Sequence, residues 1–147
     1  MKFSDISKED WESLMPYLDT CLLPVTGMTG KQSPWQATKA LEELGEQMIG
    51  LETAYKGRMV TYPALHYAAI GEAFQQQVNL ICRNLKQTGF RHVILITASP
   101  LIEELAFDEA DLVLTPATAA KGREHVRSLV EELWRESQQE AEEQVEA

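Results

Sequence analysis

The chain has 147 residues and 44% of them are hydrophobic, which predicts one globular domain with a sizeable core. Its net charge is −10 and no cluster of lysines and arginines is present, so the sequence argues against binding to nucleic acid or to an anionic membrane surface. No apolar stretch approaches the roughly 20 residues that a membrane span needs. Residues 131–147 contain seven glutamates and one arginine, so much of the acidity lies at the carboxyl-terminal end.

The first half of the chain contains two predicted helices and two predicted strands. Ser7 predicts the start of a helix that Pro16 ends early. A first strand is predicted over 20–26, and Pro24 is expected to keep it short, irregular or at a sheet edge because proline has no N–H to donate. The pattern then predicts a helix that starts at Ser33-Pro34 and ends by Gly57, a strand over 58–62, and a loop over 63–69.

The second half continues the alternation of helix and strand. Five apolar residues at helical spacing predict a helix that stops at Gly89; they are Ile70, Phe74, Val78, Ile81 and Leu85. The remaining predicted elements are a strand over 92–97, a short helix over 99–106, a strand over 111–115 and a final helix from about Thr118. After Trp134 apolar residues almost vanish. The pattern therefore predicts one α/β domain over residues 1–135 and an acidic extension over 136–147.

Strands that alternate with helices predict a parallel sheet covered by helices. We expect a three-layer α/β/α sandwich with a four-stranded, mainly parallel, Rossmann-like sheet. The expected strand order is 2-1-3-4 with right-handed crossovers. Because Pro24 argues against a central first strand, the order 1-2-3-4 stays open.

The loops after the strands are where a site is expected, since open parallel sheets bind ligands outside the carboxyl ends of their strands. These loops carry hydroxyl, lysine and histidine side chains, and the residues predicted to bind a ligand are Lys31, His66, Tyr67, Ser99 and Thr118. Together with helix starts at Ser33, Ser99 and Thr118, they suit a small anion. The alternative interpretation is that the serines and threonines are ordinary helix caps.

The sequence lacks the motifs of several common kinds of catalytic and cofactor-binding site. Gly30-Lys31 is no phosphate-binding loop, because Val25 and Gln32 occupy positions that need glycine and a hydroxyl residue. The cysteines and histidines form no cluster with metal-ligand spacing, so neither a metal nor another cofactor is expected. Two isolated cysteines without a signal peptide predict a cytoplasmic location. Pro100 removes the N–H that an oxyanion hole beside Ser99 would use, which argues against a serine hydrolase.

Three short motifs resemble a family of small uncharacterised cytoplasmic proteins of Bacillus and its relatives, the YpiF-like family. They are Tyr17-Leu18-Asp19-Thr20 before a Leu-Leu-Pro strand, Lys56-Gly57-Arg58 before the second strand, and Pro63-Ala64 after it. That family has no established activity, so this resemblance implies no substrate.

The segment from Tyr62 to Thr97 is similar in layout to creatininase-type amidohydrolases, with a long helix followed by a strand that begins Gly89-Phe90-Arg91-His92. That family follows this strand with a metal-binding His-Gly-Gly turn, where the present chain has Thr97-Ala98-Ser99. Its first strand ends in a Glu and His metal pair, where this chain has Val25-Thr26-Gly27. The resemblance therefore implies a metal-free relative that uses the fold as a scaffold.

The sequence thus favours a non-catalytic cytoplasmic protein that acts through a protein partner or a small ligand, with a homodimer as an open alternative. The alternative function is a metal-independent hydrolase or transferase that uses His66, Ser99 and Lys31. Convergence of these three side chains in one pocket would favour the enzyme.

Overall fold

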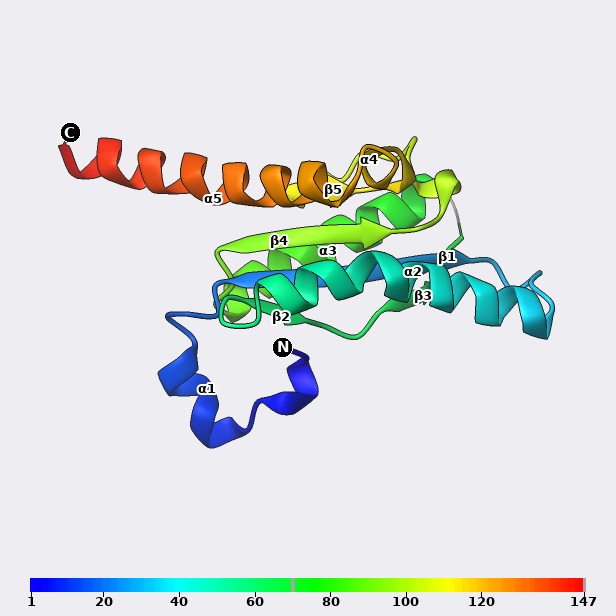
Figure 1. Ribbon diagram of the computed structural model, residues 1–147, viewed down its shortest axis with the longest axis horizontal. Coiled ribbons are helices and arrows are strands. Elements are labelled where there is room, and N and C mark those ends of the chain that lie inside the picture. Colours follow the sequence, from blue (N-terminus) through cyan, green and yellow to red (C-terminus); the bar gives the residue numbers. More distant parts are fainter. Residues whose placement is uncertain (70, 147) are drawn as a thin grey trace.

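The computed structural model describes residues 1–69 and 71–146, and its centre is a parallel sheet of five strands flanked by helices (Figure 1). Strands β2, β1, β4 and β5 follow one another across the sheet, which is the order predicted for the four expected strands. The fifth strand, β3, also pairs with β1. The strands are β1 (Thr20–Met28), β2 (Met59–Thr61), β3 (Leu65–Tyr67), β4 (His92–Thr97) and β5 (Leu112–Leu114).

Strand β3 corrects two predictions, because the sheet has five strands and residues 65–67 are not a loop. The sequence hid β3 because it has only three residues and follows Pro63. It forms because β1 is long enough to pair with a second short strand beyond β2, with Val25 opposite Leu65 and Met28 opposite Tyr67.

Of the three outcomes predicted for the strand that contains Pro24, a short strand and an edge position are wrong, whereas its pairing with β3 is irregular, with a register shift between Val25 and Met28. Strand β1 is the longest and pairs with β4 without a break from Thr20 to Val25. The Leu22 carbonyl accepts a hydrogen bond from the Tyr62 N–H at 3.0 Å. Because alternate residues of a parallel strand face the same neighbour, Pro24 faces that side too. There β2 has ended and β3 has not begun, so the missing donor falls at the break between two short strands.

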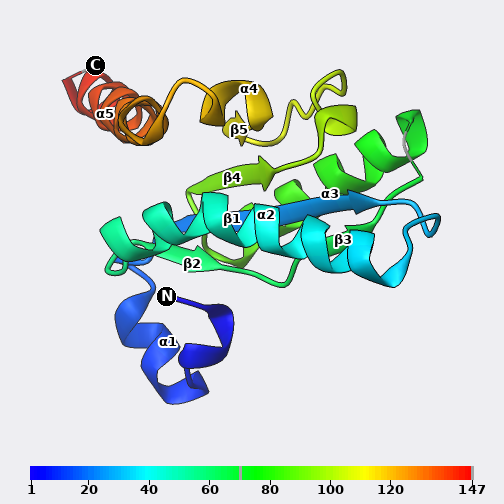
Figure 2. The same cartoon turned by 45° about the vertical axis from the view of Figure 1, so that its right-hand side comes forward.

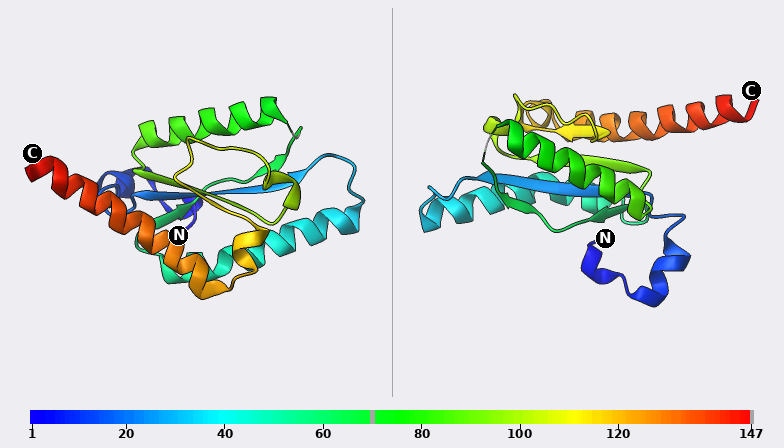
Figure 3. Two further views of the ribbon diagram at one scale, coloured as in Figure 1. Left: turned by 90° about the horizontal axis from the view of Figure 1, so that it is seen from above. Right: turned by 180° about the vertical axis from the view of Figure 1, so that it is seen from behind.

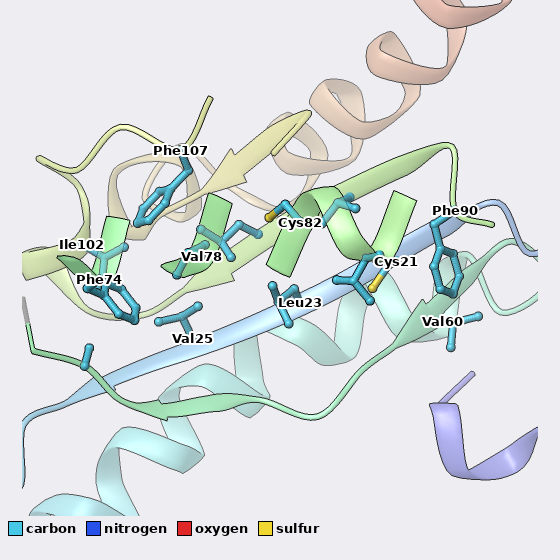
Figure 4. Close-up of a cluster of buried hydrophobic side chains, with 14 of the residues drawn as sticks. Cys21, Leu23, Val25, Val60, Phe74, Val78, Cys82, Phe90, Ile102 and Phe107 are labelled. Atoms are coloured by element: carbon cyan, nitrogen blue, oxygen red, sulfur yellow. The ribbon is translucent and has the colours of Figure 1, made fainter. Parts of the chain in front are cut away.

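The side chains of the sheet alternate between two faces, each covered by helices (Figure 3). One face packs Cys21, Leu23 and Val25 of β1 against α3 (Glu72–Thr88), and Figure 4 shows this cluster with Phe74, Val78 and Phe107. The other face packs Leu22, Ile94 and Ile96 beneath α2 (Pro34–Ala54) and α5 (Arg123–Glu146). Ile70, predicted to begin the apolar face of α3, and Ala147, at the end of the predicted acidic extension, lie outside the described residues.

The helices follow the predicted order with two corrections. Helix α1 (Lys8–Leu14) starts at Ser7, whose hydroxyl accepts a hydrogen bond from the Asp10 N–H at 3.2 Å, and it ends before Pro16 as predicted. The helix predicted over 99–106 is only the 3-10 turn η2 (Pro100–Ile102), and another such turn, η1 (Phe3–Asp5), precedes α1. The final helix is divided into α4 (Pro116–Ala119) and α5, because Gly122 between them has a φ of 103°, which a continuous helix excludes.

Helix α5 crosses one face of the sheet from the carboxyl ends of the strands to their amino ends, and then continues past it (Figures 1 and 2). Trp134 ends the crossing by donating a buried hydrogen bond from Nε1 to the Thr20 hydroxyl at 2.9 Å. The Arg58 guanidinium lies 4.0 Å from the Trp134 ring centre and forms two hydrogen bonds with the Asp19 carboxylate, at 3.0 and 3.2 Å. We call Asp19, Thr20, Arg58 and Trp134 the amino-edge network. No helix in the described chain is both long and apolar enough to cross a membrane.

Candidate functional site

Two predicted site residues lie beside the carboxyl end of β1, on opposite sides of it. On the β3 side, the Thr26 hydroxyl donates a hydrogen bond to the His66 carbonyl at 2.7 Å and lies 3.4 Å from His66 Nδ1. On the β4 side, Ser99 packs so closely on Gly27 that a Cβ built at Gly27 would lie 2.9 Å from the Ser99 Cβ. His66 and Ser99 are therefore neighbours of consecutive β1 residues, but they are separated by the strand itself.

The other predicted residues do not join them in a pocket. Lys31 is exposed, and Tyr67 is 72% exposed. Thr118 and Ser99 behave as caps: the Thr118 hydroxyl accepts from the Thr115 N–H at 2.8 Å, and the Ser99 hydroxyl accepts from the Leu101 N–H at 3.3 Å. A helix does start at Ser99, but it is the three-residue 3-10 turn η2. The helix expected to start near Thr118 starts at Pro116, so Thr118 lies inside α4.

A cavity of about 290 Å³ lies elsewhere on the same edge of the sheet, and we call it the α2–α5 cleft. It is bounded by α2, by the ends of β4 and β5, by α4 and by the first turn and a half of α5. Its lining includes Glu43, Glu46, Gln47, Gly50, Leu51, Ile96, Ala98, Leu114, Thr115, Thr118, Ala119, Gly122, Arg123, Val126 and Arg127. Of the predicted site residues only Thr118 lines it. His66 lines a separate cavity of about 230 Å³ between α2 and the amino-terminal segment.

The cleft has an apolar floor and charged walls. Leu51, Ile96 and Leu114 form the floor, and each is about 2% exposed. Two exposed glutamates, Glu43 and Glu46, stand on the α2 wall, and two exposed arginines, Arg123 and Arg127, stand on the α5 wall. Within residues 1–69 and 71–146, no ion pair within 4.0 Å joins the two walls.

Helical spacing explains why each wall presents its charges together. Arg123 and Arg127 are four residues apart and Glu43 and Glu46 are three apart, so each pair lies on one side of its helix. These four residues lie on helices α2 and α5, whereas the sequence predicted a site in the loops after the strands. The sequence signal that could have indicated this cleft is the pair Arg123 and Arg127 at the start of a helix that is rich in glutamate.

The buried ionisable groups outside the cleft are poor candidates for chemistry. Burial raises the pKa of the Cys82 thiol to about 11, although the nearby Lys86 opposes the shift, and burial also raises the pKa of Cys21. Both thiols therefore stay protonated and unreactive at neutral pH. Burial lowers the pKa of His92, which keeps its ring neutral inside the sheet. The described residues contain no group of three or more histidine, cysteine or acidic side chains placed to hold a metal ion.

A family model described as "Protein of unknown function (DUF2487)" matches residues 9–140. The chain belongs to this family. The predicted membership of an uncharacterised family is thereby confirmed, and the matched range of this DUF2487 protein includes all five strands and every residue of the α2–α5 cleft. No curated protein matches the chain, and no solved structure matches it either.

Proposed function

We propose that this DUF2487 protein is a non-catalytic protein that binds a small ligand in the α2–α5 cleft. The observation that carries the proposal is the position of the cleft outside the carboxyl ends of β4 and β5, where open parallel sheets bind their ligands. Its volume of about 290 Å³ suits a molecule of metabolite size. An apolar floor with a few polar groups at the walls is the usual composition of such a site.

The lining of the cleft supports binding rather than catalysis. Among the residues that line it, the hydroxyl groups belong to Thr115 and Thr118, and the Thr118 hydroxyl is already used in capping α4. The lining contains no histidine, cysteine or lysine, and the groups in it that could act as a base are the carboxylates of Glu43 and Glu46, both exposed. The alternative hydrolase or transferase needs His66, Ser99 and Lys31 to act together, and β1 lies between the first two.

Filling the cleft tests this function. Gly50 lines the cleft, and a Cβ built there has no atom within 4 Å, so Gly50→Leu should place a side chain in the cleft without a clash. Gly45→Leu is the matched control, because Gly45 lies on the same helix, has equally open surroundings and lines the separate His66 cavity instead of the cleft. Both changes raise helix propensity alike.

The measurement is a thermal-shift screen of metabolites below about 300 Da. We expect at least one compound that stabilises the wild type and Gly45→Leu but not Gly50→Leu, because only folded protein with an open cleft binds it. Compounds that stabilise all three proteins equally would show binding elsewhere. A complete screen without a cleft-dependent compound would reject the function.

We also propose a cytoplasmic location, which rests on two unpaired and fully buried cysteines, Cys21 and Cys82. We further propose the YpiF-like and creatininase-type resemblances, which the sequence motifs support. The three-layer, Rossmann-like description is supported by the two apolar clusters, one on each face of the sheet.

A further inference from the structure

We propose that the ligand of the α2–α5 cleft is a zwitterion in which an apolar body separates an ammonium group from an acidic group. This inference rests on the proposed small-ligand function and names the class of ligand. It replaces the small anion expected from the sequence, because the structure brings acidic and basic side chains to the same cavity.

Opposite charges on the two walls are the first argument. Glu43 and Glu46 attract a cation and repel an anion, whereas Arg123 and Arg127 do the reverse. A ligand with a single charge is therefore attracted by one wall and repelled by the other. A ligand with one charge of each sign is attracted by both walls when its ammonium lies toward α2 and its acidic group toward α5.

The lack of contact between the walls is the second argument. Arg58 and Asp19 at the other edge of the sheet satisfy each other at 3.0 Å, and Lys39 lies 3.8 Å from Glu43 within α2. Across the cleft, the described residues form no ion pair within 4.0 Å. The cavity thus leaves room for a ligand between a donor wall and an acceptor wall, and arginine is well suited to a carboxylate or phosphate.

The apolar floor between the walls defines the middle of the ligand. Leu51, Ile96 and Leu114 offer no hydrogen-bonding side chain, so the part of the ligand above them should be hydrocarbon. Charged ends joined by methylene groups match this arrangement of wall, floor and wall. Straight-chain ω-amino acids are the simplest molecules of this kind.

The test compares matched probes by isothermal titration calorimetry. The probes are straight-chain ω-amino acids of four to eight carbons, each with the carboxylic acid and the alkylamine of the same length. We expect at least one ω-amino acid to bind about tenfold more tightly than both of its matched probes, and Gly50→Leu to abolish that binding. An acid or an amine that binds as tightly as the amino acid at every length would overturn the inference.

Variants of each wall sharpen the test. Arg123→Gln with Arg127→Gln should remove the advantage of the amino acid over the amine, and Glu43→Gln with Glu46→Gln should remove its advantage over the acid. The controls are Arg135→Gln on α5 and Glu42→Gln on α2, both exposed and outside the cleft lining, and they should leave both advantages intact. Circular dichroism of each variant verifies that the fold is retained.

The outcomes separate this inference from the function on which it rests. Cleft-dependent binding of a single-charge probe or of an unrelated metabolite, without preference for the zwitterion, would reject the zwitterion and keep the ligand-binding function. If no probe and no screened metabolite binds in a manner that Gly50→Leu blocks, both proposals fail.

Discussion

The charged residues at the two edges of the sheet differ in whether they pair with one another. At the amino edge, Arg58, Asp19, Thr20 and Trp134 satisfy one another through hydrogen bonds and a stacked guanidinium. At the carboxyl edge, the arginines and glutamates of the α2–α5 cleft face a cavity, and the described residues form no ion pair across it. One helix, α5, reaches both edges, so its first turns can serve binding while Trp134 fixes its position.

This difference separates residues whose charges are paired within the fold from residues whose charges line a cavity. A network whose polar groups are already satisfied gains little from a ligand, whereas charges left beside an apolar cavity can gain a partner. Substitutions at the amino edge should therefore change stability, and substitutions at the cleft walls should change binding.

Loss of the Trp134 side chain should have the largest effect on stability. Trp134 is 9% exposed, and Trp134→Ala removes its packing, its hydrogen bond to Thr20 and the surface on which Arg58 stacks. We expect a loss of about 3–5 kcal/mol in the free energy of unfolding, measured by urea denaturation. Trp35→Ala is the control, since Trp35 is 66% exposed and should cost less than about 0.5 kcal/mol. Equal losses would mean that the amino edge does not anchor α5.

A methyl group at Gly27 should have the next largest effect, because the ends of β1 and β4 are in close contact there. Gly27 has a φ of 74°, and a Cβ would lie 2.9 Å from the Ser99 Cβ, so Gly27→Ala should cost about 2–4 kcal/mol of folding stability. Gly30→Ala also places alanine at positive φ, but it has open surroundings and should cost only about 1 kcal/mol. The comparison uses urea denaturation of both variants. The same loss in each would remove the evidence for a tight contact beneath the carboxyl edge.

A smaller effect is expected from acid at His92, which lies in the sheet near the amino-edge network. Burial lowers the pKa of His92, partly offset by Asp19 and Asp111, with Arg58 and Arg91 lowering it further. The folded state then binds fewer protons than the unfolded state below the ordinary histidine value. Stability should therefore fall as pH drops from about 7.5 to 5.5.

The control for this pH dependence is a neutral side chain at the same position. His92→Gln should flatten the fall in unfolding free energy between about pH 7.5 and 5.5. Wild type and His92→Gln with the same slope would contradict a role for the buried imidazole.

Removal of the acidic extension should have the smallest effect. Beyond Trp134 helix α5 consists mostly of exposed residues, and neighbouring glutamates repel one another. A chain ending at Ser137 should melt within about 1–2 °C of the full chain by differential scanning calorimetry. A chain ending at Leu133 is the contrast, because it lacks Trp134 and should be strongly destabilised. A large loss in the longer truncation would show that the extension docks, on this chain or on a second copy.

The sequence predicted the parts of the fold that arise from regular periodicity. The apolar run Val93-Ile94-Leu95-Ile96, the apolar positions Phe74, Val78, Ile81 and Leu85 before Gly89, and the Ser7 cap all identified their elements, and the strand order followed from general topology. Pro24 misled because the effect of its missing N–H depends on which neighbour it faces, and that depends on where β2 ends. Strand β3 could not be predicted because its three residues carry little local pattern, and it forms through pairing with β1.

The candidate site was less accessible to sequence reasoning. The sequence pointed to the edge of the sheet where the α2–α5 cleft lies, but it placed the ligand among Lys31, His66 and Ser99. Which side chains share a cavity depends on how far apart α2 and α5 lie over the sheet. That distance cannot be read from a single sequence. Gly122 splits the final helix and lets α5 start beside the cleft. The sequence shows this glycine but does not show that the helix breaks there.

The break between β2 and β3 also affects how this protein behaves at high concentration. The long strands β1 and β4 have neighbours on both sides, and the strands that border the sheet, β2, β3 and β5, each have three residues. Lys2 further covers β2 through a bridge to Thr61. Short border strands offer few free backbone groups to another chain, which is how natural proteins avoid edge-to-edge aggregation. Pro24, which looked unsuited to a central strand, thus faces the break between the two short border strands β2 and β3. We expect the folded protein to resist self-assembly by strand addition.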